Sequence, residues 1–454
     1  MSTSYLAAIE YLYHRINYER TAEAKPHTFR LRRMNDLLDL LDLRGISGGE
    51  VPLVHVAGTK GKGSTATMVA AMLTAAGLRT GLYTSPHLVD LEERLVVDGV
   101  MATQAEVVEL VATIRQAADS LGDHECGPPT FFDLTTAMAL LHFKRRGCRA
   151  VVLEVGLGGR QDSTNACAPT VTAITSIGLD HQHILGTTLA EIATQKAGII
   201  KPGVPVISGV TSGEAATTIE AIAAERSAPL YQLGRDFDYR LQPADGRWGE
   251  VLDVISQRPE IHPRTGWELP LVGQHQGRNS AIACAALDLL AQAGVPTSLA
   301  AQARGLADVR CAGRIERFVQ PDGSEILLDT AHNVDSIAAL CACLQQRAAG
   351  RSLSVIFGTS RDKDHQPMLE QLGRLADRII LTRYHGNPRY RDPAEMLADL
   401  PAGVTASIEE LPEAALDQAI AQGKADKDHL IVICGSFFLA AELRPRLLKN
   451  VSQH

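Results

Sequence analysis

Short apolar runs alternate with longer stretches of helical periodicity along most of this chain. Continuous apolar runs are typical of strands buried in a parallel sheet, and they cover Val51–Gly58, Arg79–Tyr83, Ala150–Val155 and Val171–Ile177. Helices are predicted between and after them, over Ser64–Gly77, Gln104–Leu121, Phe132–Arg145 and Leu189–Gly198. Strands that alternate with helices predict βαβ units and an α/β, doubly wound, mainly parallel sheet.

The alternation of predicted strands and helices is interrupted once and then resumes. Between Leu230 and Leu271, Pro, Gly, Asp and aromatic residues punctuate short alternating runs, which predict a small antiparallel excursion, and a helix over Arg278–Ala293 follows. The later predicted strands and helices are Glu325–Asp329, Asp335–Arg347, Leu353–Gly358, Pro367–Ala376, Arg378–Thr382 and Leu430–Ser436. We therefore expect a boundary near Leu306–Ala312, with domains over 1–306 and 312–454, the second a smaller Rossmann-like α/β domain.

Composition excludes several classes of protein. The net charge of −8 over 454 residues offers no basic surface for nucleic acid. No segment approaches the roughly 20 uninterrupted apolar residues of a membrane span, and the N-terminus lacks the apolar core of a signal peptide. The 8 cysteines form no C-x-x-C pair, so we expect reduced thiols in a cytoplasmic protein.

The stretch HVAGTKGKGSTAT, which begins at His55, has the features of a phosphate-binding loop. It follows a predicted strand and precedes a predicted helix, the context that the G-x-x-x-x-G-K-[ST] pattern requires. Its hydroxyl comes one residue late, at Ser64, because Gly63 follows Lys62. Glycines permit a tight turn, the helix start attracts anions, and Lys62 can reach the outer phosphates. The nucleotide-binding candidates here are Gly58, Thr59, Lys60, Gly61, Lys62, Gly63, Ser64 and Thr65. The alternative is a tight turn with an incidental lysine.

Three further residues have chemically demanding positions. Glu154 ends an apolar strand, where a metal ion would satisfy its carboxylate; a helix cap or an ion pair is the alternative. Lys196 has small, apolar neighbours, and burial would lower its pKa and make the amine nucleophilic. His181 follows Asp180 at a strand end, which suits a site, although an isolated histidine is more often structural.

An ordered series of motifs resembles the folylpolyglutamate synthase / dihydrofolate synthase family, which belongs to the Mur ligase group of ATP-dependent amide-forming enzymes. The series begins with GTKGKGST and TSPHLVDLEERLVVDG, and in this family the late hydroxyl is normal. It continues with TFFDLTTA, LEVGLGGRQDSTN, ITSIGLDHQHILGTTLAEIATQKAGIIKPG, GQHQGRNSAIA, GRIE, LDTAHNVDS, FGTSRDKD and CGSFFLAAE, and so covers nearly the whole chain.

The resemblance implies ATP and Mg²⁺ as cofactors and assigns residues to them. The implied metal ligands are Ser64, Ser85, Glu154 and His181. Lys196 is carbamylated in the family, which turns a cation into an anion that helps to order magnesium. Asn279, Arg314 and Asp329 match positions that contact the base, phosphates and ribose of the nucleotide. The implied catalytic residues are Lys62, Lys196, His181 and Arg314.

The same resemblance implies folate or dihydropteroate and L-glutamate as substrates of a monomeric enzyme. The acceptor-side candidates are Thr28–Leu31 (TFRL), Thr130, Phe131, Phe132, Asp133 and Asp162. Asp133 occupies a position that is usually glutamate, so its shorter side chain weakens that assignment. His332, Asn333 and Ser436 are implied in a glutamate pocket. The reaction would proceed through an acyl phosphate, with domains that close to exclude water.

Two other functions compete with this interpretation. A cell-wall Mur ligase shares the chemistry but acts on a UDP-sugar peptide, and TSPHL favours the folate branch. A nucleotide-binding protein without ligase activity would be expected to lack Glu154, His181 or Lys196, and all three are present. The sequence leaves open whether the enzyme adds the first glutamate to dihydropteroate, extends folates, or does both.

Overall fold

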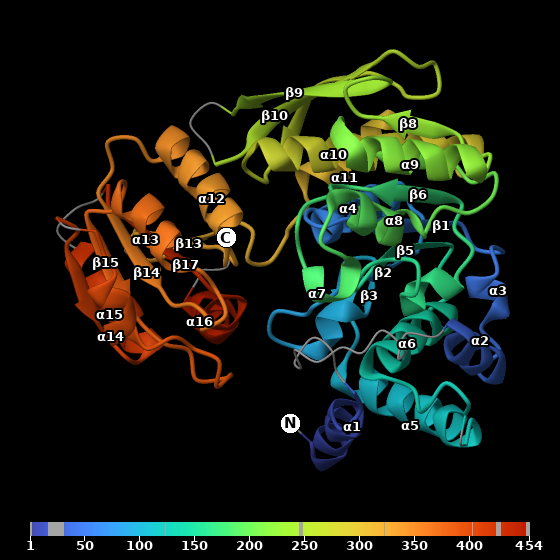
Figure 1. The fold of residues 1–454 in the computed structure, drawn as a ribbon, viewed down its shortest axis with the longest axis horizontal. Helices are drawn as coiled ribbons and strands as arrows, with labels where there is room; N and C mark the ends of the chain where they lie inside the picture. Colours follow the sequence, from blue (N-terminus) through green and yellow to red (C-terminus); the bar gives the residue numbers. More distant parts are fainter. Residues whose placement is uncertain are drawn as a thin grey trace. The chain divides into compact units, whose positions relative to one another are not determined.

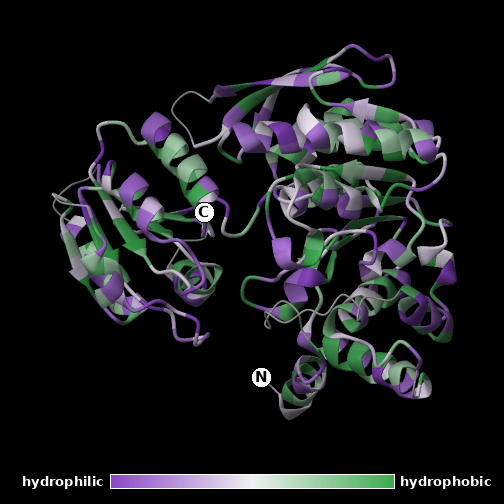
Figure 2. Cartoon of the chain, in the orientation of Figure 1, coloured by the Kyte–Doolittle hydropathy of each residue, from purple (hydrophilic) through white to green (hydrophobic). Residues whose placement is uncertain are grey.

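A computed structural model gives the fold of residues 2–16, 31–122, 124–244, 248–321, 323–401, 403–423 and 428–450. The chain forms two compact units: Met1–Pro270 with Gln274–Arg310, and Leu271–Gly273 with Cys311–His454. Each unit is an α/β layer structure with its own sheet (Figure 1). Hydrophobic residues concentrate along the strands of both sheets, and hydrophilic residues lie on outer helix faces and loops (Figure 2).

The first unit contains an eight-stranded sheet in the order β4-β3-β2-β5-β1-β6-β7-β8. Its strands are β1 (Leu53–Ala57), β2 (Thr80–Tyr83), β3 (Val96–Val97), β4 (Val100–Met101), β5 (Ala150–Glu154), β6 (Val171–Ile174), β7 (Val206–Ser208) and β8 (Leu230–Gln232). All neighbouring strands from β2 to β8 are parallel, and the β3–β4 hairpin adds an antiparallel edge. The prediction of a doubly wound, mainly parallel sheet is confirmed.

Helices cover both faces of this sheet. They are α1 (Thr3–Tyr13), α2 (Leu31–Leu40), α3 (Arg44–Ser47), α4 (Lys62–Ala75), α5 (Gln104–Ser120), α6 (Phe131–Arg145), α7 (Gln182–Leu185), α8 (Leu189–Ala197), α9 (Gly213–Glu225), α10 (Gln274–Gln292) and α11 (Leu299–Ala307). Side chains alternate along β5: Leu153 packs into the cluster with α5 and α6, whereas Glu154 faces the start of α4. This alternation brings a carboxylate to the amino end of a helix.

The antiparallel excursion is smaller than the sequence pattern predicted. A three-stranded sheet is formed by β9 (Phe237–Pro243), β10 (Glu250–Ser256) and β11 (Arg264–Leu269). β8, which the pattern placed in the excursion, instead extends the main sheet parallel to β7, where Tyr231 and Gln232 are buried. Helix α10 begins four residues earlier than predicted, and α11 was not predicted.

The second unit contains a six-stranded sheet in the order β12-β13-β17-β14-β15-β16. The strands are β12 (Glu316–Val319), β13 (Glu325–Leu328), β14 (Leu353–Phe357), β15 (Arg378–Leu381), β16 (Ala406–Ile408) and β17 (Leu430–Cys434). Only β12 is antiparallel to its neighbour. The helices are α12 (Val334–Arg347), α13 (Gln366–Gly373), α14 (Pro393–Ala398), α15 (Pro412–Gly423) and α16 (Phe437–Asn450). Within the described residues, no helix combines the length and apolar character that a bilayer crossing requires.

Candidate functional site

The phosphate-loop candidates lie at the carboxyl edge of the main sheet. β1 lies between β5 and β6, and β2 lies beyond β5, so the loops that follow these four strands meet at one edge. Ligands of open α/β sheets bind at this edge, where the strand order reverses. The structure therefore brings together segments that are more than a hundred residues apart in the sequence.

Two glycines give the loop its shape. Gly61 caps α4 with a φ of 86°, and Gly58 has a φ of 151°. A Cβ atom at Gly61 would overlap the Asn279 side chain, and one at Gly58 would overlap the Thr175 hydroxyl. Only glycine fits both positions, and Asn279 consequently lies directly against the loop.

The loop is anchored to the segment after β6. Thr59 N donates to Ser176 O (2.7 Å), and Lys60 N donates to Ser176 Oγ (3.0 Å). Gly178 N in turn donates to Thr59 Oγ1 (3.0 Å). These bonds fix the backbone before any ligand binds, so the amide groups of the first turn of α4 are preorganised for an anion.

Lys62 and Ser64 keep their polar groups available. Among the described residues, none forms an ion pair or hydrogen bond with the Lys62 ammonium or the Ser64 hydroxyl. Thr65 is fully buried in the next position of α4, and its hydroxyl has no partner in this part of the chain. The helix start, the lysine and the serine are therefore arranged as a phosphate site requires.

Glu154 faces the loop from the end of β5. Its Oε2 accepts a hydrogen bond from Ser85 N (3.0 Å), and an added Cβ at Gly63 would lie 3.3 Å from the same oxygen. The Glu154 side chain is buried, with 4% of its surface exposed. Gly63 thus lets α4 approach the carboxylate, and Ser85, Glu154 and the loop converge at one place.

Lys196, near the end of α8, reaches the first residue of the loop. Its Nζ donates to Gly58 O (2.9 Å), and only 4% of the residue is exposed. Burial, reinforced by the Lys62 charge, lowers the pKa of Lys196 to about 7. The lowered pKa therefore makes the neutral amine accessible near neutral pH.

His181 is a more exposed member of the same edge. Its backbone has a φ of 48°, and its Nε2 lies 3.8 Å from Asp180 Oδ1. Partial burial lowers the pKa of His181, although the Asp180 charge opposes this shift. A neutral imidazole can act as a metal ligand.

On the predicted acceptor side, Asp133 is engaged by its own chain. Its Oδ2 accepts from Arg33 Nη2 (2.6 Å), Thr130 N (2.9 Å) and Thr130 Oγ1 (2.8 Å), and its Oδ1 accepts from Ser163 Oγ (2.7 Å). Arg33 and Asp133 form a buried ion pair between α2 and α6. Asp133 therefore caps α6 and holds the loop after β5.

The other acceptor-side candidates differ in access. Phe131 is fully buried and stacks on Tyr13, with ring centroids 5.4 Å apart, whereas Phe132 is partly exposed. Asp162 accepts from Gly156 N (3.1 Å) and Leu157 N (2.9 Å), and burial raises its pKa to about 6. In the TFRL stretch, residues 28–30 lie outside the described residues.

In the second unit, Asp329 follows β13 and lies near Arg314, which precedes the antiparallel strand β12. Asp329 Oδ2 accepts from Ile315 N (2.8 Å), and Oδ1 accepts from Ala331 N (2.7 Å). Burial raises the pKa of Asp329, and the Arg314 charge opposes this shift. Arg314 is exposed and donates from Nη1 to Thr330 Oγ1 (3.0 Å).

His332, Asn333 and Ser436 lie at the carboxyl edge of the second sheet. His332 Nδ1 bonds to Thr330 O (2.8 Å). Asn333 is the N-cap of α12 and accepts from Ser336 N (2.9 Å), while Ser436 Oγ accepts from Phe438 N (3.1 Å). All three are therefore held in place by the loops that carry them.

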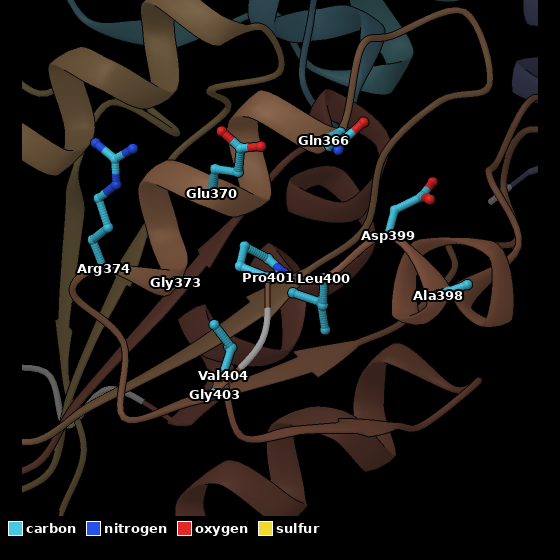
Figure 3. A pocket seen from close by; sticks show the side chains of 10 residues that line it. All are labelled: Gln366, Glu370, Gly373, Arg374, Ala398, Asp399, Leu400, Pro401, Gly403 and Val404. Atoms are coloured by element: carbon cyan, nitrogen blue, oxygen red, sulfur yellow. The ribbon is translucent and has the colours of Figure 1, made fainter.

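A separate hollow of about 620 Å³ lies beside α13 and α14 in the second unit (Figure 3). Its charged lining residues are Glu370, Arg374 and Asp399. None of the predicted site residues lines it. The hollow is therefore distinct from the carboxyl-edge candidates of this unit.

Comparison with known proteins agrees with this geometry. The Mur ligase middle domain model matches residues 56–287, and the model of the Mur ligase, glutamate ligase domain matches residues 313–437. The chain is 35% identical to the folylpolyglutamate synthase of Lacticaseibacillus casei, over 96% of this chain and 100% of that protein. The chain belongs to the folylpolyglutamate synthase / dihydrofolate synthase family.

Two other members of the folylpolyglutamate synthase / dihydrofolate synthase family are similar over essentially their whole length. The dihydrofolate synthase/folylpolyglutamate synthase of Bacillus subtilis is 33% identical over 98% of this chain and 100% of that protein. The structure of Mycobacterium tuberculosis folylpolyglutamate synthase, complexed with ADP and AMPPCP, superposes with a TM-score of 0.84 at 29% identity, covering 99% of both chains.

Sequence reasoning missed the residues that support this site. Arg33, Ser163, Thr175 and Ser176 hold the loops but belong to no phosphate or metal motif. Thr175 and Ser176 lie at the end of the predicted strand Val171–Ile177 and within the ITSIGLDHQH motif, and these two placements were the available signal. Arg33 gave no signal, because its partner Asp133 is a hundred residues away.

Proposed function

We propose that this protein is an ATP-dependent ligase that joins L-glutamate to a carboxylate of folate or dihydropteroate. Family membership supports this reaction, as does the structure of Mycobacterium tuberculosis folylpolyglutamate synthase complexed with ADP and AMPPCP. The observation that carries the proposal is the convergence of Lys62, Glu154 and Lys196 on one preorganised loop.

The chemistry explains why an anion-binding loop is needed. A free carboxylate does not form an amide at a useful rate, because the leaving group would be oxide. Transfer of the γ-phosphoryl group converts the carboxylate into an acyl phosphate, and the amine of glutamate then displaces phosphate. Lys62 and the amides of the first turn of α4 would stabilise the charge on the transferring group.

The residues around Glu154 fit a magnesium ion. Mg²⁺ is usually held by one or two carboxylates together with substrate phosphates and water. Glu154, Ser85 and Ser64 would hold it, because Ser85 and the start of α4 both lie against the Glu154 carboxylate. The ion would neutralise negative charge on the phosphates. His181 is proposed as a ligand for a second ion.

We also propose that Lys196 is carbamylated. Only a neutral amine attacks carbon dioxide, and a lysine with a pKa of about 7 supplies that form at neutral pH. The product is an anion, which would remove the repulsion between Lys196 and Lys62. NMR of protein equilibrated with ¹³C-bicarbonate should show a carbamate resonance that a Lys196→Ala variant lacks.

The remaining assignments are proposals that rest on the family resemblance. Asn279, Arg314 and Asp329 are proposed to contact the nucleotide, and His332, Asn333 and Ser436 to contact glutamate. Thr130, Phe132, Asp133 and Asp162 are proposed on the acceptor side, where the last two act through the loops they hold. Phe131 is proposed there as well, but its burial limits it to supporting the pocket wall. The protein is proposed to act as a monomer, which light scattering would test.

The direct test combines the protein with ATP, L-glutamate and one acceptor. We expect ADP release, measured by a coupled assay. We also expect a product that is heavier by one glutamate residue, measured by mass spectrometry. Dihydropteroate and a reduced folate are assayed side by side, because their relative rates decide between the two activities. A UDP-sugar peptide is the third acceptor. The proposal would be contradicted if ADP were released only with the UDP-sugar peptide, or if none of the three acceptors led to ADP release.

A further inference from the structure

We infer that Arg389 binds a carboxylate of the glutamate substrate, an assignment that rests on the proposed function. Arg389 lies in the loop after β15, inside the region matched by the glutamate ligase domain model. It was not among the residues that the sequence motifs indicated. The inference depends on the unusual surroundings of its guanidinium group, all of which belong to the second unit.

The Arg389 loop has a fixed backbone at the carboxyl edge of the second sheet. It runs antiparallel beside the loop that follows β14, with a bridge between Ser360 and Tyr390. Arg361 N donates to Arg389 O (2.8 Å), and Arg391 N donates to Thr359 O (2.8 Å). These bonds hold Arg389 at the edge where ligands of open α/β sheets bind.

The guanidinium of Arg389 stacks on an aromatic ring. Its Cζ lies 5.7 Å from the centroid of the Phe438 ring, which is itself 5.2 Å from the Tyr384 ring. Phe438 N donates to Ser436 Oγ, so the ring that the guanidinium contacts and Ser436 lie on the same short segment. Stacking stabilises a cation and fixes its orientation, and it uses none of the in-plane N–H donors.

Neighbouring arginines form ion pairs with carboxylates, whereas within the described residues Arg389 forms none and interacts with the Asp362 carboxylate only at longer range. Arg383 Nη2 lies 2.7 Å from Glu410 Oε2, and Arg391 Nη1 lies 3.2 Å from Glu395 Oε2. Within the described residues, no hydrogen bond or ion pair engages the Arg389 guanidinium, although the residue is half-buried and its Nε is inaccessible to solvent. A half-buried guanidinium without an acceptor is costly, so a ligand that supplies one is favoured.

The Arg389 guanidinium is better suited to a carboxylate ligand than to a phosphate group. The planar fork of arginine matches a carboxylate in bidentate geometry. Ser360 and Tyr384 already share a 2.6 Å hydrogen bond, which keeps the Tyr384 hydroxyl at this edge. Glutamate has two carboxylates that stay charged while its amine reacts, so a cation dedicated to one of them would select a dicarboxylic amino acid.

The test compares steady-state kinetics of wild type, Arg389→Gln and Arg389→Lys. We expect Arg389→Gln to raise KM for glutamate about 10- to 100-fold, the range for losing a hydrogen bond to a charged group. KM for ATP and for the acceptor should change less than about 3-fold, since the other substrates do not use this cation. The KM for glutamate of Arg389→Lys should lie between those of wild type and Arg389→Gln, because lysine keeps the charge but lacks the planar fork.

Arg383→Gln is the matched control, because Arg383 lies on the same aromatic cluster but is already paired with Glu410. Its KM for glutamate should stay within about 3-fold of wild type. An unchanged KM in Arg389→Gln, an equal rise in Arg383→Gln, or an equal rise in KM for ATP would overturn the assignment. Circular dichroism and Tm confirm that each variant is folded.

A binding measurement separates this inference from the proposed function. If wild type turns over none of the acceptors, the proposed reaction has failed, and the effect of L-glutamate on Tm then decides the role of Arg389. A rise in the Tm of wild type that is absent in Arg389→Gln supports the assignment. Equal rises in both proteins, or no rise in wild type, reject it.

Discussion

The carboxyl edges of the two sheets are built from similar strand–loop–helix units but use their polar groups differently. At the first edge, the backbone of the loop is anchored by Ser176, and the Lys62 ammonium and Ser64 hydroxyl stay without partners in the described chain. At the second edge, Asn333 and Ser436 are engaged as caps, and the available group is a stacked arginine. The first edge therefore offers backbone amides and one lysine, as proposed for phosphate recognition, whereas the second edge offers side chains on several loops.

The largest expected effect is that of Lys62→Ala, which removes the lysine ammonium at the carboxyl edge of the first sheet. We expect kcat/KM for ATP to fall by about 10³-fold, because the variant removes a charge that would stabilise the transferring phosphoryl group. ADP release measures this loss. Lys144→Ala, an exposed lysine paired with Asp42, is the control and should retain wild-type turnover. A loss below about 10-fold in Lys62→Ala would show that the loop does not hold the phosphates as proposed.

Glu154→Gln tests whether the same edge holds magnesium. The amide keeps an acceptor for Ser85 N but loses the negative charge, so the fold should be preserved. We expect the Mg²⁺ concentration at half-maximal turnover to rise about 100-fold, with a smaller rise in Ser85→Ala. Titration of ADP release with Mg²⁺ gives both values. An unchanged magnesium requirement would place the ion elsewhere.

Lys196→Met tests the cost of burying an amine beside the loop. Folding lowers the pKa of Lys196 from 10.5 to about 7, so between pH 7 and pH 10.5 the Lys196 amine is protonated in the unfolded chain but mostly neutral in the folded one. Burial of the Lys196 ammonium thus lowers the free energy of unfolding of wild type by roughly 3–5 kcal/mol below pH 7. This loss disappears as the pH rises toward 10.5.

The free energy of unfolding of Lys196→Met should therefore exceed that of wild type most at pH 6–7. This difference should shrink by about 2–3 kcal/mol between pH 7 and pH 9, measured by urea denaturation in bicarbonate-free buffer. Lys144→Met should show no such pH dependence, since Lys144 is partly exposed in both states. A difference that is constant with pH would mean that the ammonium is not buried.

Asn333 gives the smallest expected effect and separates its two roles at the second edge. Asn333→Ala should lower the free energy of unfolding by about 1 kcal/mol, because it removes the N-cap of α12. Asn333→Asp keeps an accepting oxygen and should restore stability. If the amide also donates to glutamate, both variants raise KM for glutamate about 5-fold, and this rise separates binding from capping. A wild-type KM in both would leave Asn333 as a cap alone.

Much of the fold could be predicted because local patterns carried it. The runs around Val51–Gly58, Ala150–Val155 and Leu353–Gly358 became β1, β5 and β14 within one or two residues, because buried parallel strands are apolar on both faces. β8 was assigned to the wrong sheet because three residues carry too little pattern to reveal their neighbour. Helix α10 began early because polar Gln274 and His275 precede its apolar face.

The sequence by itself determined the phosphate-type loop and the family, because Gly58–Thr65 is contiguous and the other motifs follow in order. It also drew attention to Glu154 and Lys196 from their apolar surroundings. Only the tertiary structure decided that Ser85 N bonds Glu154, that Lys196 reaches Gly58 O and that Arg389 stacks on Phe438. These contacts join residues 49 to 138 positions apart, and such pairings depend on strand order and helix packing, which no local pattern encodes.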